Sequence, residues 1–411
     1  MTSAFYPAAT QLYSFGELPF VRCIDVINYP VISDLQREEF ERLPSSFVMN
    51  HKTIKTLHAG DIVITKVGSP CFASVLDESV PEVALSRTVL GLKDVRIDPY
   101  YLVAFLRSKY GFLQLMRERE LTIQLQLTLE RVGRIRVFVP SSRTIVNGVA
   151  SLVKQYFMLF KEAIRLYSRA EDTLVKHLGL RDYKPRNELS YVGQLSQAFG
   201  VHRVDAEYFQ PAYDRVTKHV MEYSNGCVPL PSRAVNVHSD YEPARYPNRT
   251  FSYVELANVD SSIGVIRDVS TIRGREAPSR ARRLLRRDDV IVSSIEGSLQ
   301  RTARVEEEFE GALASTGFFQ FRCTEILPQV LLVLCKSVVL QAQLKRQCAG
   351  TILSAVPNQA LKRIVLPLLP EDIQEEIAAL VSQSHQANAK AELVFDKAKR
   401  TVEEEIERDF A

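Results

Sequence analysis

The stretch "RDDVIVSSIEG", residues 287–297, contains a charged turn, a short β-branched strand and then a polar loop. A second stretch, "GDIVITKVGSP" at residues 60–70, has the same order of turn, aspartate, strand and loop. Their paired aspartates, Asp61 and Asp289, are separated by 228 residues (289 − 61). β-Branched residues bounded by turn residues predict a buried strand in each place. The pair therefore calls for a comparison of the two halves of the chain.

The elements that follow each strand also repeat. A strand that begins near a serine comes next, with the sequences "LSRTVLGLK" at 85–93 and "ASTGFFQFR" at 314–322. An apolar stretch of helical length follows in both halves, starting at residue 100 and at residue 328. Because order and spacing agree over several elements, we expect an internal duplication of one structural unit.

Each half ends in a strand, a proline and a long helix. The strands are "GRIRVFVP", which ends at Pro140, and "KRIVLPLLP", which ends at Pro370. Apolar residues then recur every three or four positions over some 35 residues, which predicts a helix about 50 Å long with a coiled-coil-like seam. The predicted seam includes Leu152, Tyr156, Leu159 and Ala163 in the first helix and Ile377, Leu380, Ala387, Ala391 and Val394 in the second.

These elements predict an α+β fold class. Two α/β globular units alternate with two long coiled-coil-like helices, so that the chain forms a pseudo-two-fold internal repeat. The first unit is predicted at residues 1–141 and its helix at 142–182. The second unit is predicted at 183–370, including a lead-in segment at 183–215, and its helix at 371–411.

The composition is that of an ordinary globular chain. Of its 411 residues, 46% are hydrophobic and 25% are charged, with a net charge of +3. The most apolar run, "VLLVLCKSVVL" at 330–340, is too short to span a bilayer, and the N-terminus does not resemble a signal peptide, so we expect a cytoplasmic protein. The six cysteines form no CxxC pair and no zinc-type cluster with histidine, so no metal site is predicted.

Motifs of catalysis are absent from the sequence. It contains no glycine-rich phosphate loop, no nucleophile elbow and no Asn-Pro-Pro-aromatic tetrapeptide. Asp61 and Asp289 lack the second carboxylate and the lysine that a nuclease-like site needs. We therefore expect both aspartates to cap turns, and the chain to be a binding protein without catalytic residues.

Positive charge is concentrated before the second aspartate, in "IRGREAPSRARRLLRRDD" at 272–289. Such a run suits a nucleic-acid phosphate backbone, although a solvated loop without a partner is the alternative. The corresponding stretch of the first half, "MNHKTIKTLHAGD" at 49–61, is less basic. Including the loops after the two signature strands, the candidate DNA-binding residues are Lys52, Lys55, Lys66, Ser69, Arg87, Arg273, Arg275, Arg280, Arg282, Arg283, Arg301 and Arg304.

Several stretches together resemble the specificity (S) subunit of type I restriction–modification systems. Besides the two Asp-strand signatures they are "FVRCIDVINYPVIS" at 20–33, "RVDAEYFQP" at 203–211, "FSYVELANVDSSIGVI" at 251–266 and "IVLPLLPEDIQEEIAAL" at 364–380. The resemblance covers nearly the whole chain. The first half departs from it because it lacks a counterpart of residues 203–211.

The resemblance implies a non-catalytic DNA reader. In that family each globular unit, a target recognition domain, reads one half of a bipartite DNA target. The two helices pair antiparallel, set the spacing and bind two DNA adenine methyltransferase subunits, and some systems add a restriction subunit. S-adenosylmethionine would bind the methyltransferase, so no cofactor is expected in this chain. A related phage-defence system, a coiled-coil scaffold and a diverged DNA nuclease remain open as alternatives.

Overall fold

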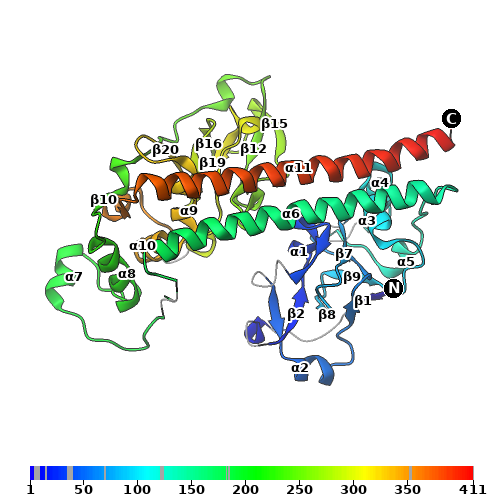
Figure 1. The fold of residues 1–411 in the computed structure, drawn as a ribbon, viewed down its shortest axis with the longest axis horizontal. Helices are drawn as coiled ribbons and strands as arrows, with labels where there is room; N and C mark the ends of the chain where they lie inside the picture. The colour runs from blue at the N-terminus through cyan, green and yellow to red at the C-terminus, as the bar shows by residue number, and fades with distance from the viewer. Residues whose placement is uncertain are drawn as a thin grey trace. The chain divides into compact units, whose positions relative to one another are not determined.

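The fold comes from a computed structural model, which describes residues 1–3, 10–13, 16–34, 40–68, 71–120, 125–181, 183, 186–350 and 354–410. The chain divides into two compact units. Unit 1 consists of residues 1–162 together with 387–411, and unit 2 consists of residues 163–386. Both units mix strands and helices, and two long helices, α6 (Arg143–His177) and α11 (Glu371–Asp409), are divided between them (Figure 1). The predicted α+β class is confirmed.

Unit 1 contains two sheets around one apolar core, in which Phe20, Leu57 and Val83 are fully buried. One sheet has the order β4 (Glu41–Leu43), β2 (Leu18–Val21), β8 (Glu82–Leu85) and β5 (Thr56–His58). The other has the order β1 (Thr2–Ser3), β9 (Val89–Leu92), β6 (Ile62–Thr65), β7 (Ala73–Leu76) and β3 (Val31–Ile32). The predicted signature strand is β6, at the centre of the second sheet.

Unit 2 repeats this topology except at the place of β3, where β14 (Val265–Ile266) pairs with β13 (Val259–Asp260) in a separate two-stranded sheet. One sheet has the order β15 (Ser270–Arg273), β12 (Thr250–Val254), β19 (Leu313–Ser315) and β16 (Ala281–Leu284). The other has the order β11 (Ala234–Asn236), β20 (Phe318–Cys323), β17 (Val290–Ser293) and β18 (Thr302–Arg304). The middle strands of the first sheet are parallel in both units, and their outer neighbours are antiparallel. The internal duplication is therefore confirmed, and it includes the first strands of each unit.

The two signature aspartates form the same turn. Asp61 Oδ2 accepts a hydrogen bond from the backbone N–H of His58, and Asp289 Oδ2 accepts one from that of Arg286, both at 2.9 Å. The residue before each aspartate has a positive φ, +82° in unit 1 and +67° in unit 2. A side-chain carboxylate that accepts from a backbone N–H three residues earlier stabilises such a tight turn. The expectation that both aspartates cap turns is thus confirmed.

The apolar helix expected in each half is broken by a serine. The helices are α3 (Pro99–Arg107) and α4 (Lys109–Arg117) in unit 1, and α9 (Pro328–Lys336) and α10 (Val338–Gln347) in unit 2. Ser108 Oγ donates to the carbonyl of Phe105, and Ser337 Oγ donates to that of Leu334, both at 2.7 Å. Each hydroxyl satisfies a carbonyl at the end of the first helix, so the chain can turn there and start a second helix.

The strand expected before each proline forms only in unit 2. There β21 (Val365–Pro367) pairs antiparallel with β10 (Cys227–Pro229). β10 follows α8 (Pro211–Met221), a helix that begins near the end of the predicted lead-in segment at 183–215. Residues 133–140 form no strand, so that expectation is wrong for the first copy. A strand needs a partner for its backbone groups, and the described part of unit 1 contains no segment paired with these residues.

The long helices form as expected, and they pack together inside each unit. In unit 2, Ser384 Oγ donates to the carbonyl of Ala163 at 2.7 Å, and Thr173 Oγ1 donates to Glu376 Oε1 at 3.3 Å. The partners follow opposite orders along the two helices, so the helices are antiparallel there. In unit 1 the rings of α6 Tyr156 and α11 Phe395 lie 5.1 Å apart between centroids.

The seam differs in phase from the predicted one. Tyr156, Ala163, Ile377, Leu380, Ala387 and Ala391 are buried as expected. Leu152, Leu159 and Val394 are only half-buried, whereas their neighbours Val153, Phe160 and Phe395 lie in the interior. In each of these pairs both residues are apolar. The sequence therefore allows either residue of a pair to be the one that faces the partner helix. Contacts with the globular part decide between them, since Phe160 also packs on Tyr29 with ring centroids 5.7 Å apart.

We predict that Phe395→Ala destabilises unit 1 by about 3–5 kcal/mol, because it removes a buried ring from the seam. Leu393→Ala, two residues away and 69% exposed, is the matched control and should change stability by less than about 0.5 kcal/mol. Urea unfolding followed by circular dichroism measures both variants. Equal effects of the two substitutions would contradict the assignment of the seam.

Candidate nucleic-acid interface

Three loops of unit 2 meet where the signature strand β17 ends. The backbone N–H of Ser294 donates to the carbonyl of Gly317 at 2.9 Å, and that of Val356 donates to the carbonyl of Ser294 at 2.8 Å. The N–H of Thr316 donates to the carbonyl of Arg280, also at 2.8 Å. We call residues 280, 294–300, 316–317 and 354–356 the strand-end edge of unit 2. Loops fixed in this way to a rigid sheet are suited to present side chains to a ligand.

Unit 1 contains the same arrangement. The N–H of Lys66 donates to the carbonyl of Thr88 at 2.7 Å, and the N–H of Leu127 donates to the carbonyl of Lys66 at 2.9 Å. We call residues 66–68, 87–88 and 125–127 the strand-end edge of unit 1. The candidates Lys66 and Arg87 both lie on it, whereas Ser69 lies outside the described residues.

The remaining basic candidates of unit 1 precede β5. Lys52 and Lys55 are both exposed, and Lys55 Nζ donates to the carbonyl of Lys52 at 2.9 Å. Lys52 stands 228 residues before Arg280 (280 − 52), which is the separation of the two signature aspartates. By this count Lys52 aligns in sequence with Arg280, although β16 has a bulge after Ala281 that β5 lacks.

The arginine run does not form a single patch, because it follows β16 across the sheet. Arg280 is exposed at the strand-end edge, and Arg282 is half-buried with its guanidinium 3.9 Å from Glu242. Arg283 is only 4% exposed and donates to the carbonyl of Val237 at 2.6 Å, and burial lowers its pKa to about 10. β16 is bulged between Ala281 and Arg283, and Arg283 pairs with Ala314 of the buried core, so its side chain turns into the interior. We therefore omit Arg283 from the candidate surface.

The other arginines lie away from the edge or have internal partners. Arg273 and Arg275 are exposed at the end of β15 and in the turn after it, and Arg275 pairs with Glu276 at 3.4 Å. Arg301 donates to the carbonyl of Val259. Arg304 is bound by Asp288 at 2.9 Å and by Glu306 at 2.7 Å. Of the second-half candidates, the structure thus brings only Arg280 to the edge.

Sequence reasoning missed the residues that flank the edge in unit 2. A hollow beside the loop 296–300 is also lined by Tyr213 of α8 and by Gln341 and Lys345 of α10. Gln341 Nε2 donates to the carbonyl of Leu299 at 3.2 Å, so α10 holds the loop in place. No local pattern marks these side chains, because packing of α8 on α10 assembles them from separate parts of the sequence.

A polar cluster links unit 2 to its part of α11. His385 Nδ1 lies 2.7 Å from Glu306 Oε1, and its Nε2 lies 2.9 Å from the carbonyl of Ile263. Burial by itself raises the pKa of Glu306, but the hydrogen bond from His385 and the charge of Arg304 outweigh burial and lower the pKa below the usual value. The ionised carboxylate of Glu306 therefore stabilises the folded state at neutral pH.

We predict that Glu306→Gln lowers the free energy of unfolding by about 1–2 kcal/mol at pH 7. A carboxyl whose pKa is lowered by folding contributes stability above its unfolded pKa and loses it as the pH falls through the folded pKa. The difference in unfolding free energy between wild type and variant should therefore shrink as the pH falls below about 4, the ordinary glutamate pKa. Urea unfolding at pH 7 and at about pH 3 measures it, and a difference that grows on acidification would contradict this role.

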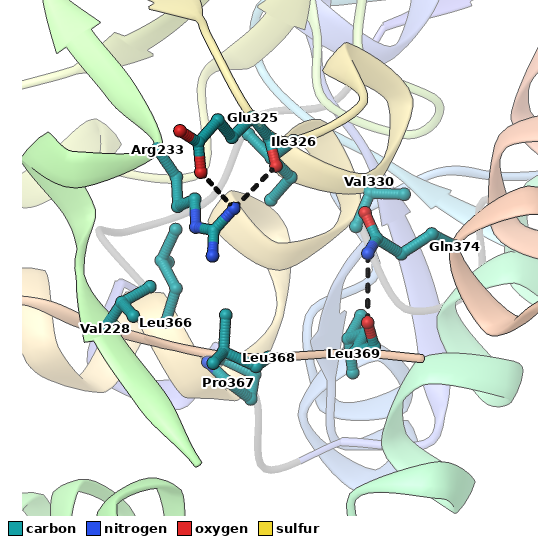
Figure 2. Close-up of a pocket in the computed structure, with 10 residues that line it drawn as sticks. All are labelled: Val228, Arg233, Glu325, Ile326, Val330, Leu366, Pro367, Leu368, Leu369 and Gln374. Atoms are coloured by element: carbon teal, nitrogen blue, oxygen red, sulfur yellow. Dashed lines mark hydrogen bonds and ion pairs between the residues drawn. The ribbon is translucent and has the colours of Figure 1, made fainter. Parts of the chain in front are cut away.

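One pocket of unit 2 lies beside the β10–β21 pair, where α11 begins. Figure 2 shows Val228 of β10 next to Leu366 of β21, and Arg233 turned towards Glu325. Arg233 binds that carboxylate at 2.5 Å, and Gln374 Nε2 donates to the carbonyl of Leu369 at 2.9 Å. Leucine and valine side chains form much of the remaining wall, so the pocket lacks the convergent titratable groups of a catalytic site.

Two general features bear on the kind of site. Among the described residues, no three histidine, cysteine, aspartate or glutamate side chains come together in a way that could hold a metal ion. Within the same residues, no helix is both long and apolar enough to cross a membrane.

The chain is similar to solved structures from type I restriction–modification systems. The HsdS subunit of Thermoanaerobacter tengcongensis is 29% identical over 41% of this chain and 43% of that one, with a TM-score of 0.34, so the match spans less than half of that subunit. The S subunit of M. genitalium is 10% identical over 98% of this chain and 92% of that one, with a TM-score of 0.41. A chain from a study of type I system assembly is 15% identical over 84% and 83%, with a TM-score of 0.29. No protein-family model and no curated protein match the chain.

Proposed function

We propose that the chain is the specificity subunit of a type I restriction–modification system or a related defence system, a non-catalytic protein that recognises a bipartite DNA target in the cytoplasm. The observation that carries this proposal is the duplication. Two units of the same topology each present three loops at one strand-end edge, and two antiparallel helices are shared between the units. A duplicated reader on shared helices suits a target made of two half-sites.

In this proposal each edge enters the DNA groove. Exposed Lys and Arg side chains contact phosphates, whereas polar side chains of the loops reach base edges. Unit 1 supplies the exposed Lys52 and Arg87 and the half-buried Lys66 for phosphate contacts, and unit 2 supplies Arg280. Ser298 and Gln300 are the candidates for base contact, because they lie in the loop that α10 holds in place.

The helices have two roles in this proposal. The shared seam fixes the separation of the half-sites, and the outer faces of α6 and α11 bind two adenine methyltransferase subunits. S-adenosylmethionine belongs to those subunits, and a restriction subunit joins them in systems that also cleave DNA. This chain supplies recognition and assembly.

We predict that Arg280→Ala binds every duplex severalfold more weakly. Each lost phosphate contact should also reduce the slope of log affinity against log salt by about one. Arg408→Ala, an exposed arginine of α11, is the matched control and should bind DNA as the wild type does. Fluorescence anisotropy between roughly 50 and 200 mM salt measures all three proteins. Loss confined to one DNA sequence would contradict the phosphate assignment, and a wild type that retains no duplex, even with its methyltransferase, would contradict the proposed function.

We predict that lengthening both helices by one heptad lengthens the DNA target. The insertions follow Glu162 and Gln386, where each helix passes from one unit to the other. A heptad preserves the seam and adds about 10 Å of helix, equivalent to about three base pairs. Mapping of methylated sites should find both half-sites unchanged and the gap between them longer. An unchanged gap would mean that the helices do not set the spacing.

A further inference from the structure

Unit 1 exposes an apolar face whose counterpart in unit 2 is covered. Leu113 of α4 is 53% exposed, and Val137 and Val139 are 38% and 48% exposed. We call these three residues and Arg117 the uncovered face. Apolar side chains that gather on a surface, rather than being scattered singly, mark a site of interaction.

A glutamine fixes the equivalence of the two faces. Gln114 of α4 bonds both backbone groups of Arg136, at 3.0 and 2.9 Å. Gln343 of α10 bonds both backbone groups of Val365 in the same way, at 3.0 and 2.9 Å. Both separations are 229 residues (343 − 114 and 365 − 136). Residues 135–139 therefore lie against α4 as β21 lies against α10, although they form no strand.

The separation of 229 residues also identifies the segment that covers this face in unit 2. Leu113 corresponds to Ala342, which is 5% exposed and packs against Tyr213 and Val216 of α8. Val137 corresponds to Leu366, which is 1% exposed and pairs with Val228 in β10. The cover is thus a helix followed by an extended segment, and it comes from the region for which the described part of unit 1 has no equivalent.

The correspondence between the two faces extends to a charged side chain and to a backbone amide. Arg346 of α10 binds Asp214 of α8 at 2.8 Å, and its counterpart in unit 1 is Arg117, which pairs with Glu118 at 3.0 Å and is still 66% exposed. In unit 2 the N–H of Leu368 donates to the carbonyl of Gly226 at 3.0 Å, and Val139 stands at the position of Leu368. An occupant that follows the pattern of unit 2 would offer an acidic residue to the exposed guanidinium of Arg117 and a backbone carbonyl to Val139.

We propose that the uncovered face of unit 1 is a docking site for a helix-and-strand segment of the methyltransferase subunit, formed like α8–β10 but supplied by that second polypeptide. The inference rests on the proposed function. The face is continuous with the part of α11 that belongs to unit 1, since the N–H of Lys109 donates to Glu403 at 2.6 Å and Tyr110 Oη donates to Glu407 at 2.8 Å. A second copy of this chain fits less well, because its own α8–β10 already covers its unit 2.

The test uses the full chain and an adenine methyltransferase from the same organism. Leu113→Lys/Val137→Lys places two charges on side chains that are already exposed, so the fold should persist. We expect calorimetry to show at least tenfold weaker binding of the methyltransferase. Hydrogen exchange at the Val139 amide of the wild-type chain should slow when the methyltransferase is added, because a new backbone hydrogen bond protects that amide. Val235→Lys, which charges a 52% exposed valine of unit 2, is the matched control and should bind as the wild type does.

The outcomes separate this inference from the proposed function. If the wild-type chain binds no methyltransferase, the partner assignment fails and this inference fails with it. If wild type and double variant bind equally, and exchange at Val139 is unchanged in the complex, only the docking site is overturned. If light scattering shows a dimer of this chain that the double variant abolishes, the occupant is a second copy and the methyltransferase assignment is overturned.

Discussion

Burial of the seam between α6 and α11 is the constraint on which both units depend. Unit 1 contains the first part of α6 and the last part of α11, and unit 2 contains the remaining parts. Rings such as Phe160 and Phe395 are nearly inaccessible in unit 1, and each contributes on the order of 1.5–3 kcal/mol by burial. Neither unit completes its core without both helices, so the duplicated fold is one interdependent structure although its sheets form separately.

Duplication preserved the sheets and changed what surrounds them. The turn aspartates, the serine helix breaks and the glutamine clamp of the post-helix segment are present in both copies. The last residue of the first apolar helix is basic in both copies but makes different contacts. Arg107 of α3 donates to the carbonyl of Ala73, whereas the ammonium of Lys336 in α9 lies 3.8 Å from the ring centroid of Tyr167 in α6. The scaffold is therefore common to both copies, while its contacts with helices and neighbours are particular to each.

The sequence predicted those features that depend on neighbouring residues. A β-branched run after a turn aspartate is enough to place β6 and β17, and steps of three and four are enough to place the long helices. Residues 133–140 match β21 in pattern but have no partner strand among the described residues of unit 1, and local sequence does not reveal this. The seam phase was ambiguous for a similar reason, because Leu159 and Phe160 are both apolar and only the contact of Phe160 with Tyr29 separates them. At the candidate site, charge drew attention to the arginine run as a whole, whereas the bulged pairing of β16 with β19 turns Arg283 inward and leaves Arg280 at the edge.

The division of α11 between the units also affects biosynthesis. Residues 387–409 complete unit 1, yet the ribosome makes them after all of unit 2. Contacts such as that of Tyr156 with Phe395 close a loop of more than two hundred residues, and such non-local contacts form late. During translation, unit 1 must therefore wait with part of its apolar surface exposed while unit 2 can already fold. The nascent chain is then most vulnerable to aggregation in its first half, and access of a chaperone to that half would matter most shortly before synthesis ends.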